Sequence, residues 1–404
     1  MINLEIPKKF VPLVGQAHQV AEEVFRPISR KYDQEEHAYP KELDMLAALI
    51  DGMNDGSATG GAGAAGVRRT KSDDDSVKNG SNMSTVLGII ELCWGDVGLL
   101  LSMPRQGLGN SAIASVANDE QLERFKGKWA AMAITEPEAG SDSASIRTTA
   151  VLDEATGEYV LNGEKIYVTS GERADLVVVW ATLDRSKGRA AIKSFVVERS
   201  NPGLKLDRLE HKLGIRASDT AAFILDDCRV PKENLLGSPD VDVEKGFAGV
   251  MQTFDNTRPL VAAMAVGLTR ACLEETKRLL GEAGVEVNWD RPAARQPAAA
   301  AEYLAMEADY EAARLLTLEA AWMADNGKPN SLQASMAKAK AGRTCVDVAL
   351  RCVGLCGSLG YGEELLLEKW ARDAKILDLF EGTQQIQLLI VARQLLGKSS
   401  AELK

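Results

Sequence analysis

The sequence predicts a multidomain α+β protein in which helical regions flank a central antiparallel β region. Apolar residues follow a helical period from Pro7 to about Ile50, a period of two between Trp129 and about Val230, and a helical period again from Gly246. A chain of 404 residues is also too long for one ordinary core. We therefore expect an N-terminal helical domain, a β domain and a C-terminal helical bundle over residues 1–128, 129–240 and 241–404.

The composition is that of a folded protein with an acidic surface. Hydrophobic residues make up 45% of the chain and charged residues 26%, the balance of a globular protein. The formal net charge of −11 argues against a nucleic-acid-binding protein, which needs basic patches for phosphates. No apolar run is long enough to span a bilayer, and Met1–Lys9 lacks the apolar stretch of a signal peptide. We expect a cytoplasmic protein without a membrane span.

Neither the cysteines nor the histidines are spaced as metal ligands. The six cysteines form no C-x-x-C pair, and Cys352 and Cys356, one helical turn apart, are interpreted as core residues. His18 and His37 have no His or Cys partner at ligand spacing. We therefore expect no metal site and no disulfide framework.

The N-terminal region contains one long interruption of the helical pattern. Residues 51–82 are rich in Gly, Ser and Asp, which predicts a mobile surface loop. Within it, Gly61–Gly66 matches the pattern G-x-G-x-x-G, but neither flank is a periodic strand or helix, so a dinucleotide-binding fold is not indicated. The helical period returns from Met83 to about Ala117.

Short alternating runs predict the strands of the β domain. Two of them, Tyr159–Leu161 and Lys165–Thr169, flank Asn162-Gly163. Asn-Gly between alternating runs is a strong hairpin signal because both residues tolerate positive φ, so we expect a tight turn there. Further strands are expected at Leu176–Trp180, Ser194–Val197 and Ala222–Leu225.

Long amphipathic segments predict a C-terminal bundle of four helices. The first carries an apolar stripe of Val261, Ala265, Leu268 and Cys272. The others are expected at Ala299–Ala324, Ser331–Cys352 and Thr383–Leu396, with a helix stop at Asp325–Pro329.

Two runs in the β region have the composition of a ligand-binding surface. Ile134–Asp142 joins a strand end to a turn of small and hydroxyl residues, which can present N–H groups to a planar or anionic ligand. In Ile166–Gly171, Tyr167 and Thr169 alternate along one strand and should share a face, where one can stack on a ring and the other can donate a hydrogen bond. The alternatives are an ordinary β-turn and a solvated Thr beside a core-edge Tyr.

A third run, Phe254–Pro259, places charged residues beside a proline. Pro259 should fix a helix start or a kink near Asp255 and Arg258. The arginine could hold a phosphate or a carbonyl there, and the alternative is an Asp–Arg pair on the surface.

A fourth run places Glu381 between apolar Leu379-Phe380 and Thr383, a good N-cap for the final helix. Glu381 should therefore lie on a turn assisted by Gly382. Loss of hydration beside the apolar residues would raise the pKa of Glu381 and make it a useful base near neutral pH. The alternative is a simple capping acid.

These runs, in this order on an α–β–α plan, closely resemble the acyl-CoA dehydrogenase family. The resemblance covers about Lys128 to Gly397 well and the N-terminal helices more loosely. It implies an N-terminal helical domain, a central antiparallel β-barrel and a C-terminal four-helix bundle that clasp FAD and an acyl-CoA. The matching runs are Thr135–Asp142, Asn162–Thr169, Arg216–Thr220, Val230–Asn234, Phe254–Pro259 and Arg372–Gln387.

The resemblance also implies the chemistry and the site. Glu381 would remove the α-proton of an acyl-CoA thioester while N5 of FAD accepts the β-hydride, which gives a 2,3-trans double bond. The thioester carbonyl would be polarised by the Glu381 backbone N–H and a ribityl hydroxyl. Implied FAD contacts are Met132, Ile134, Thr135, Gly140, Ser141, Tyr167, Thr169, Thr383 and Gln385. Implied substrate contacts are Ser141, Asp255, Arg258 and Gly382.

The resemblance implies electron transfer flavoprotein as the redox partner and a tetrameric assembly. Two contacts that the family gives to the FAD of a neighbouring subunit are missing. No Arg-x-x-Phe-Gly run occurs over Gly281–Pro297, and Gly354 replaces a Gln that precedes a Gly-Gly pair, here Gly357-Ser358. These departures suggest a heterotetramer with a related chain (α₂β₂), with a homotetramer as the alternative. A non-catalytic or partner-dependent subunit and an acyl-CoA oxidase are competing interpretations.

Overall fold

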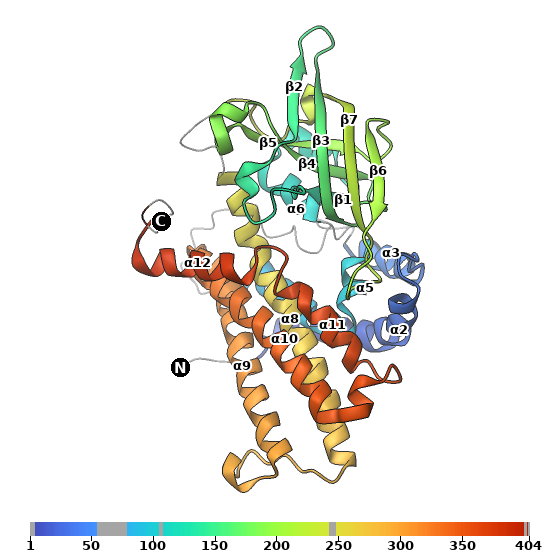
Figure 1. Cartoon of the computed structure of the whole chain (residues 1–404), viewed down its shortest axis with the longest axis vertical. Helices are drawn as coiled ribbons and strands as arrows, with labels where there is room; N and C mark the ends of the chain where they lie inside the picture. The colour runs from blue at the N-terminus through green and yellow to red at the C-terminus, as the bar shows by residue number, and fades with distance from the viewer. Residues whose placement is uncertain (1–4, 55–78, 105–107, 242–247, 400–401, 403–404) are drawn as a thin grey trace.

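The computed structural model describes residues 5–54, 79–104, 108–241, 248–399 and 402; of residues 49–54 and 248–256 it describes the backbone alone. A sheet occupies one end of the molecule and long helices extend away from it (Figure 1). Of the predicted loop over residues 51–82, residues 51–54 are helical and residues 81–82 begin another helix. Residues 55–78, with Gly61–Gly66, lie outside the described residues.

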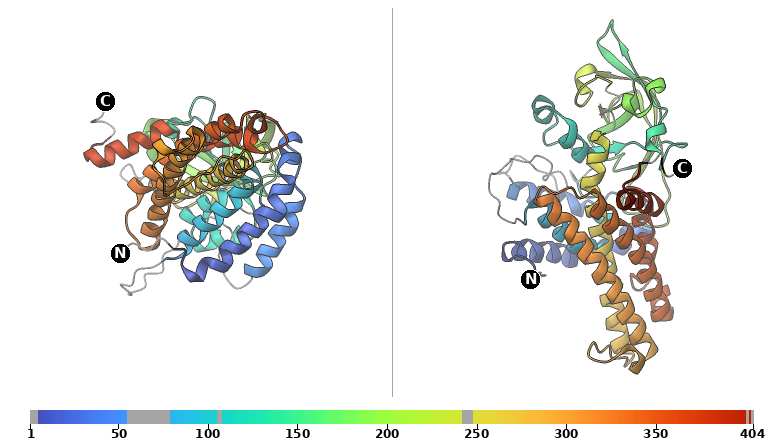
Figure 2. Two further views of the ribbon diagram at one scale, coloured as in Figure 1. Left: turned by 90° about the horizontal axis from the view of Figure 1, so that it is seen from below. Right: turned by 90° about the vertical axis from the view of Figure 1, so that its left-hand side faces the viewer.

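The N-terminal region is helical, as predicted. Figure 2 shows its helices packed beside the C-terminal helices, and the contact between α4 and α8 (Ala248–Glu282) joins the two sets. The helices are α1 (Val11–Val20), α2 (Arg26–Gln34), α3 (Glu42–Asn54), α4 (Ser81–Gly95), α5 (Val97–Leu101), α6 (Leu108–Val116) and α7 (Asp119–Arg124). Among the described helices, none is long and apolar enough to cross a membrane.

The central region forms one mixed sheet, so the prediction of purely antiparallel pairing is wrong. The order is β1-β4-β2-β3-β7-β6, with β5 also paired to β4, and β1 runs parallel to β4. The chain reaches β4 from β1 only after the β2–β3 hairpin, and this crossover makes the parallel pair possible. The strands are β1 (Ala130–Ala133), β2 (Thr149–Asp153), β3 (Glu158–Thr169), β4 (Leu176–Thr182), β5 (Ile192–Glu198), β6 (Leu204–Leu209) and β7 (Thr220–Pro231).

The predicted hairpin turn at Asn162-Gly163 is also wrong, because both residues lie inside β3. The hairpin turn falls earlier, where the Gly157 N–H donates to the Asp153 carbonyl at 2.8 Å. Gly163 instead occupies an irregularity in the pairing of β3 with β7, with φ 153°. A Cβ there would lie 2.5 Å from the Thr148 hydroxyl oxygen. The glycine therefore serves a close approach and a β-bulge.

The C-terminal region consists of long helices. The stripe Val261, Ala265, Leu268 and Cys272 on α8 is buried, and α9 ends at Asp325, as predicted. Pro259 lies inside α8 and not at its start. One helix, α11, was not predicted. The remaining helices are α9 (Ala298–Asp325), α10 (Ser331–Tyr361), α11 (Leu367–Leu377) and α12 (Gln384–Leu396).

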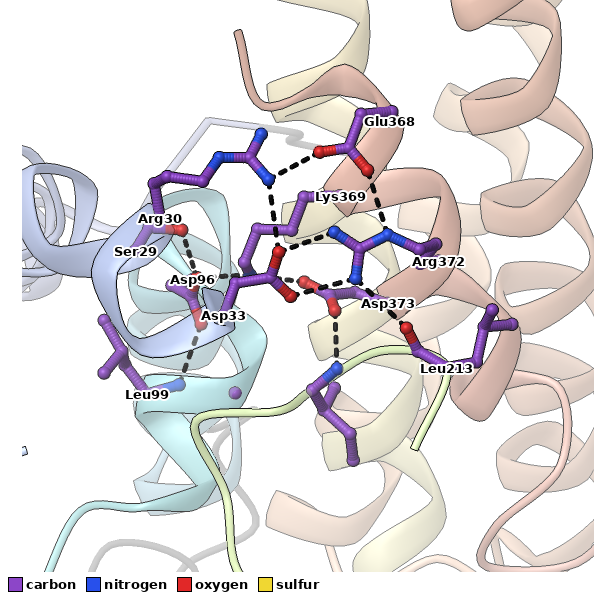
Figure 3. A network of polar contacts seen from close by, with 12 residues as sticks. Ser29, Arg30, Asp33, Asp96, Leu99, Leu213, Glu368, Lys369, Arg372 and Asp373 are labelled. Atoms are coloured by element: carbon purple, nitrogen blue, oxygen red, sulfur yellow. Dashed lines mark hydrogen bonds and ion pairs between the residues drawn. The ribbon is translucent and has the colours of Figure 1, made fainter. Parts of the chain in front are cut away.

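A buried ionic network centred on α11 ties the N-terminal helices to the sheet connection and the C-terminal helices (Figure 3). Lys369 Nζ lies 2.6 Å from both Asp96 Oδ2 and Asp373 Oδ2, and all three side chains are at most 1% exposed. Asp96 also accepts the Leu99 N–H as the N-cap of α5, while Asp373 accepts the Ile215 N–H from the β6–β7 connection. The network thereby fixes the helix that leads to residue 381.

Candidate active site

The turn between α11 and α12 holds its central residues in a left-handed conformation. Glu381 has φ 56° and Gly382 has φ 94°. Such a φ is unfavourable for a residue with a Cβ, so the surrounding contacts must hold it. Gln387 Nε2 donates to the carbonyls of Glu381, at 3.0 Å, and Gly382, at 3.3 Å. Thr383 caps α12 by accepting the Ile386 N–H, as predicted.

The carboxylate of Glu381 points toward α8. Thr257 Oγ1 donates to Glu381 Oε2 at 2.7 Å, which fixes one carboxylate oxygen. Burial raises the pKa of Glu381 above its ordinary value, although Thr257, Arg258 and Lys338 act in the opposite direction. The direction of the shift agrees with the sequence analysis, and it moves the carboxyl toward the range of a general base.

Two buried cations lie close to this carboxylate. Lys338 on α10 is fully buried, and its Nζ donates to the Gly382 carbonyl at 2.6 Å. Burial lowers the pKa of Lys338 to about 8, against the influence of Asp378 and Glu381. Arg258 is 3% exposed and its guanidinium lies 3.4 Å from the Ser335 hydroxyl oxygen. The two cations therefore offset part of the electrostatic penalty of an ionised, half-buried Glu381.

Thr257 and Lys338 were not among the site residues predicted from the sequence. Lys338 had a usable signal, because it lies on the same helical face as Ala334 and Ala341, both of which are buried. A lysine in a stripe of small residues must find a partner inside the protein. Thr257 precedes the predicted Arg258, but nothing in its own type distinguishes it from an ordinary helical threonine.

Hydrogen bonds from β3 and from residues before β2 fix the turn after β1. Glu136 is buried and accepts hydrogen bonds from the Thr148 N–H at 3.0 Å and from Lys165 Nζ at 2.7 Å. The Ile166 N–H donates to the Thr135 carbonyl at 2.9 Å, which attaches this turn to β3. Gly140 and Ser141 are exposed beyond it, and a Cβ at Gly140 would meet only open space.

Tyr167 and Thr169 lie on β3 next to this turn. Tyr167 is 62% exposed with φ 57°, Thr169 is half-buried, and Val168 between them is fully buried. A register shift separates Lys165 from Val168, so the strand is irregular where Tyr167 projects. An aromatic ring exposed by a bulge is available to a planar ligand.

The predicted residues thus fall into two groups. Glu381, Gly382, Thr383 and Arg258 meet at the α11–α12 turn, whereas Gln385 is exposed on α12. The side chain of Asp255 lies outside the described residues. Met132, Ile134, Thr135, Gly140, Ser141, Tyr167 and Thr169 lie along the β1 edge of the sheet and the adjoining part of β3. A cavity of about 340 Å³ between α7 and the sheet contains none of these residues.

Comparisons with known proteins agree with this fold. Residues 131–228 match the family model "Acyl-CoA dehydrogenase, middle domain", and residues 244–396 match "Acyl-CoA dehydrogenase, C-terminal domain". The acryloyl-CoA reductase (NADH) of Anaerotignum propionicum is 30% identical over 95% of this chain and 93% of its own. A short-chain-specific acyl-CoA dehydrogenase of Megasphaera elsdenii is 32% identical over 97% of this chain and 98% of its own.

The solved structures extend the likeness to three dimensions. Butyryl-CoA dehydrogenase from Megasphaera elsdenii superposes with a TM-score of 0.84 at 30% identity, covering 98% of this chain and 100% of that one. The matches run through the sheet, the strained turn and the helices on either side of it. The chain belongs to the acyl-CoA dehydrogenase family.

Proposed function

We propose that the protein is an FAD-dependent acyl-CoA dehydrogenase that introduces a 2,3-trans double bond into an acyl-CoA thioester, with Glu381 as the base. One observation carries the assignment of the base. Glu381 is a half-buried carboxylate on a strained turn; its Oε2 accepts the Thr257 hydroxyl, and burial raises its pKa. A capping acid would lie exposed at the helix N-terminus and would not need this support.

The surrounding residues prepare Glu381 for proton abstraction. Thr257 orients the carboxylate, while Arg258 and Lys338 lower its pKa against the effect of burial and so favour the ionised form. Because Glu381 has a positive φ, its own backbone N–H is turned out of the helix ladder and can donate to a thioester carbonyl. The acidity of the α-carbon rises as that carbonyl is polarised, and the proton passes to Glu381.

The β1 edge has the features that FAD needs. β1 stands at the end of the strand order, so one side of it can offer backbone groups to a planar heterocycle. We propose that Thr135, Tyr167 and Thr169 contact FAD at that edge, with exposed Gly140 and Ser141 beside it for the cofactor pyrophosphate or the pantetheine. Bound FAD would supply the two-electron acceptor for the hydride that leaves the β-carbon. We propose Met132, Ile134, Thr383 and Gln385 as the remaining contacts.

The finer architecture follows the same proposal. We propose the domain boundaries 1–128, 129–240 and 241–404, with a barrel-like sheet as the middle domain and a four-helix bundle as the last. Asp255 and Arg258 are proposed to bind the CoA moiety, and electron transfer flavoprotein is proposed to reoxidise the enzyme.

We further propose an α₂β₂ heterotetramer with a related chain. Large apolar side chains between 45% and 81% exposed follow α10 and α12, as expected for surfaces covered by other subunits. Gly357, with φ 57° and ψ −128°, bends α10 at the position where the resemblance places the first residue of a Gly-Gly pair. The exposed residues are Leu350, Leu359, Tyr361, Leu388, Leu389, Leu395 and Leu396.

Purification of the chain alone and together with candidate related chains tests both proposals. We expect the co-expressed assembly to carry about one FAD per two chains, and the chain alone to hold less flavin. Anaerobic addition of butyryl-CoA and longer thioesters should bleach the bound flavin. A flavin-loaded homotetramer of this chain would contradict the α₂β₂ arrangement, whereas a fully loaded assembly that no thioester bleaches would contradict the dehydrogenase.

Replacing Lys338 by Met should shift the pH dependence of the reaction. Lys338 lowers the pKa of Glu381, so its removal should raise that pKa further and move the acid limb of the kcat/KM profile to higher pH. Lys338 itself has a pKa of about 8, so the difference should shrink above that pH as the native ammonium loses its charge.

Lys340→Met is the matched control for this change. Lys340 lies two positions along α10 and pairs with Asp309 near the surface. The pH profile of kcat/KM for Lys340→Met should coincide with that of the unmodified protein. Superimposable profiles for Lys338→Met and the unmodified protein would show that Lys338 does not act on the base.

A further inference from the structure

The fold brings together two histidines and a glutamate that lie far apart in the sequence. Glu36 and His37 follow α2, and His211 lies in the connection between β6 and β7. One ligand atom from each of the three residues lies within 4.8 Å of the others. The chain has three histidines, so two of them converge here although their sequence spacing gives no hint of it.

The geometry points to a binding site for a divalent transition metal of the Zn²⁺ class at Glu36, His37 and His211. Two imidazoles and one carboxylate form a donor set that Zn²⁺ and its neighbours in the series accept, and three protein ligands leave one coordination position for water. The ligand atoms are close enough to move onto one ion with small side-chain rotations, since metal–ligand distances are about 2.0–2.2 Å.

The orientation of the side chains supports this assignment. Neither ring nitrogen of His37 has a hydrogen-bond partner among the described residues, although both atoms are buried. The His37 and His211 rings lie 5.0 Å apart at 56°, which is not a parallel stack and allows their lone pairs to converge. An imidazole buried without a partner is unfavourable unless a ligand completes it.

Glu36 is held in the way that metal-binding carboxylates are held. Its Oε1 accepts the Lys212 N–H at 2.8 Å, which fixes the orientation of the carboxylate. Its Oε2 lies 2.8 Å from His211 Nδ1, so these two atoms already face one another. A metal ion would replace this contact and keep the bond from Lys212.

Two nearby cations are engaged elsewhere and do not fill the site. Lys212 Nζ donates to the Ser218 carbonyl at 2.8 Å, and Arg173 pairs with Asp219 while donating to the carbonyl of Ala38 at 3.0 Å. The contacts of Arg173 hold the α2–α3 turn against the β6–β7 connection. A bound ion would therefore join the N-terminal helices to the sheet at the surface.

Zn²⁺ titration of the flavin-loaded protein by calorimetry, with Co²⁺ as a visible spectroscopic probe, tests the site. We expect one ion per chain, with the absorption bands of Co²⁺ bound to nitrogen and oxygen. His211→Ala should abolish this binding, and Glu36→Gln, which can still accept the Lys212 N–H, should weaken it by about 10-fold or more. His211 has an 82% exposed side chain, so its removal should leave the fold intact.

His18→Ala is the matched control, because His18 pairs with Glu91 away from this cluster. The Zn²⁺ titration of the His18→Ala variant should match that of the unmodified protein. Any ion bound by the six cysteines would persist in His211→Ala, so the difference between the two titrations isolates the proposed site. Equal stoichiometry and affinity in His211→Ala and the unmodified protein, or no binding in either, would overturn the proposal.

Discussion

Replacing Glu381 by Gln is expected to lower kcat/KM for acyl-CoA by about 10²–10⁴-fold, the usual contribution of a positioned general base. The amide keeps the size of the carboxylate and can still accept the Thr257 hydroxyl, so the substitution removes the base without removing the contact. Acyl-CoA-driven dye reduction measures the change. Flavin content and thioester binding should stay close to those of the unmodified protein, which separates lost chemistry from lost binding.

The same substitution should leave the protein as stable as before, or more stable, at neutral pH. Burial raises the folded pKa of Glu381 above its unfolded value, so ionisation destabilises the fold at pH above both values. This destabilisation disappears as the pH falls below the unfolded pKa. The Tm of Glu381→Gln should therefore exceed that of the unmodified protein near neutral pH and approach it in acid.

Glu364→Gln provides the control, because Glu364 is exposed on the same part of the chain. It should change neither turnover nor Tm. Unchanged turnover in Glu381→Gln would refute the assignment of the base and would favour a non-catalytic subunit. A large fall in Tm would show instead that the charged carboxylate supports the turn.

Replacing Lys369 by Met should lower the free energy of unfolding by about 3–5 kcal/mol, because it leaves buried carboxylates without their cation. Asp96 and Asp373 are both fully buried, and Lys369 Nζ is 2.6 Å from each. Burial alone would lower the pKa of Lys369, but Asp373 and Asp96 raise it well above the ordinary value. The lysine therefore stays charged across the physiological range, and its contribution is lost as the pH rises through its raised pKa. Urea unfolding followed by tryptophan fluorescence measures the loss.

Lys205→Met is the matched control for burial. Lys205 Nζ lies 2.6 Å from Asp226 Oδ2, the same separation as in the buried pairs, but both side chains are more than half exposed. Exposed ion pairs contribute about 0–1 kcal/mol, so this variant should unfold almost as the unmodified protein does. Equal effects of the two substitutions would show that burial does not set the strength of the network.

The order of helical and β regions was readable from the sequence because period 3.6 and period 2 are local properties. The α8 stripe, the end of α9 at Asp325 and the Thr383 cap follow from residues a few positions apart. The hairpin at Asn162-Gly163 was wrong because the same dipeptide also suits a bulge where another strand approaches closely. Gly163 is needed because Thr148 packs closely against it, and the residues next to Gly163 in the sequence do not show this contact.

The candidate site was predictable only in part, for a similar reason. Glu381 has a local signature in its apolar flank and the following glycine. The side chains that orient Glu381 and shift its pKa come from α8 and α10. Their position beside Glu381 depends on how these helices pack, which the local sequence does not show. Helix α11 was not predicted because its buried face carries two charged residues, Lys369 and Asp373. In the sequence alone these residues indicate an exposed surface, whereas in the fold Lys369 pairs with Asp96 and Asp373 in the interior.

The parallel pairing of β1 with β4 has a consequence for how the chain reaches its native state. The β2–β3 hairpin closes through a short local turn. The pairing of β1 with β4 instead joins Ala130 to Leu176, which lies far along the chain. Loops of that length close more slowly than hairpins. The β1 edge, which is proposed to bind the flavin, therefore forms after most local structure.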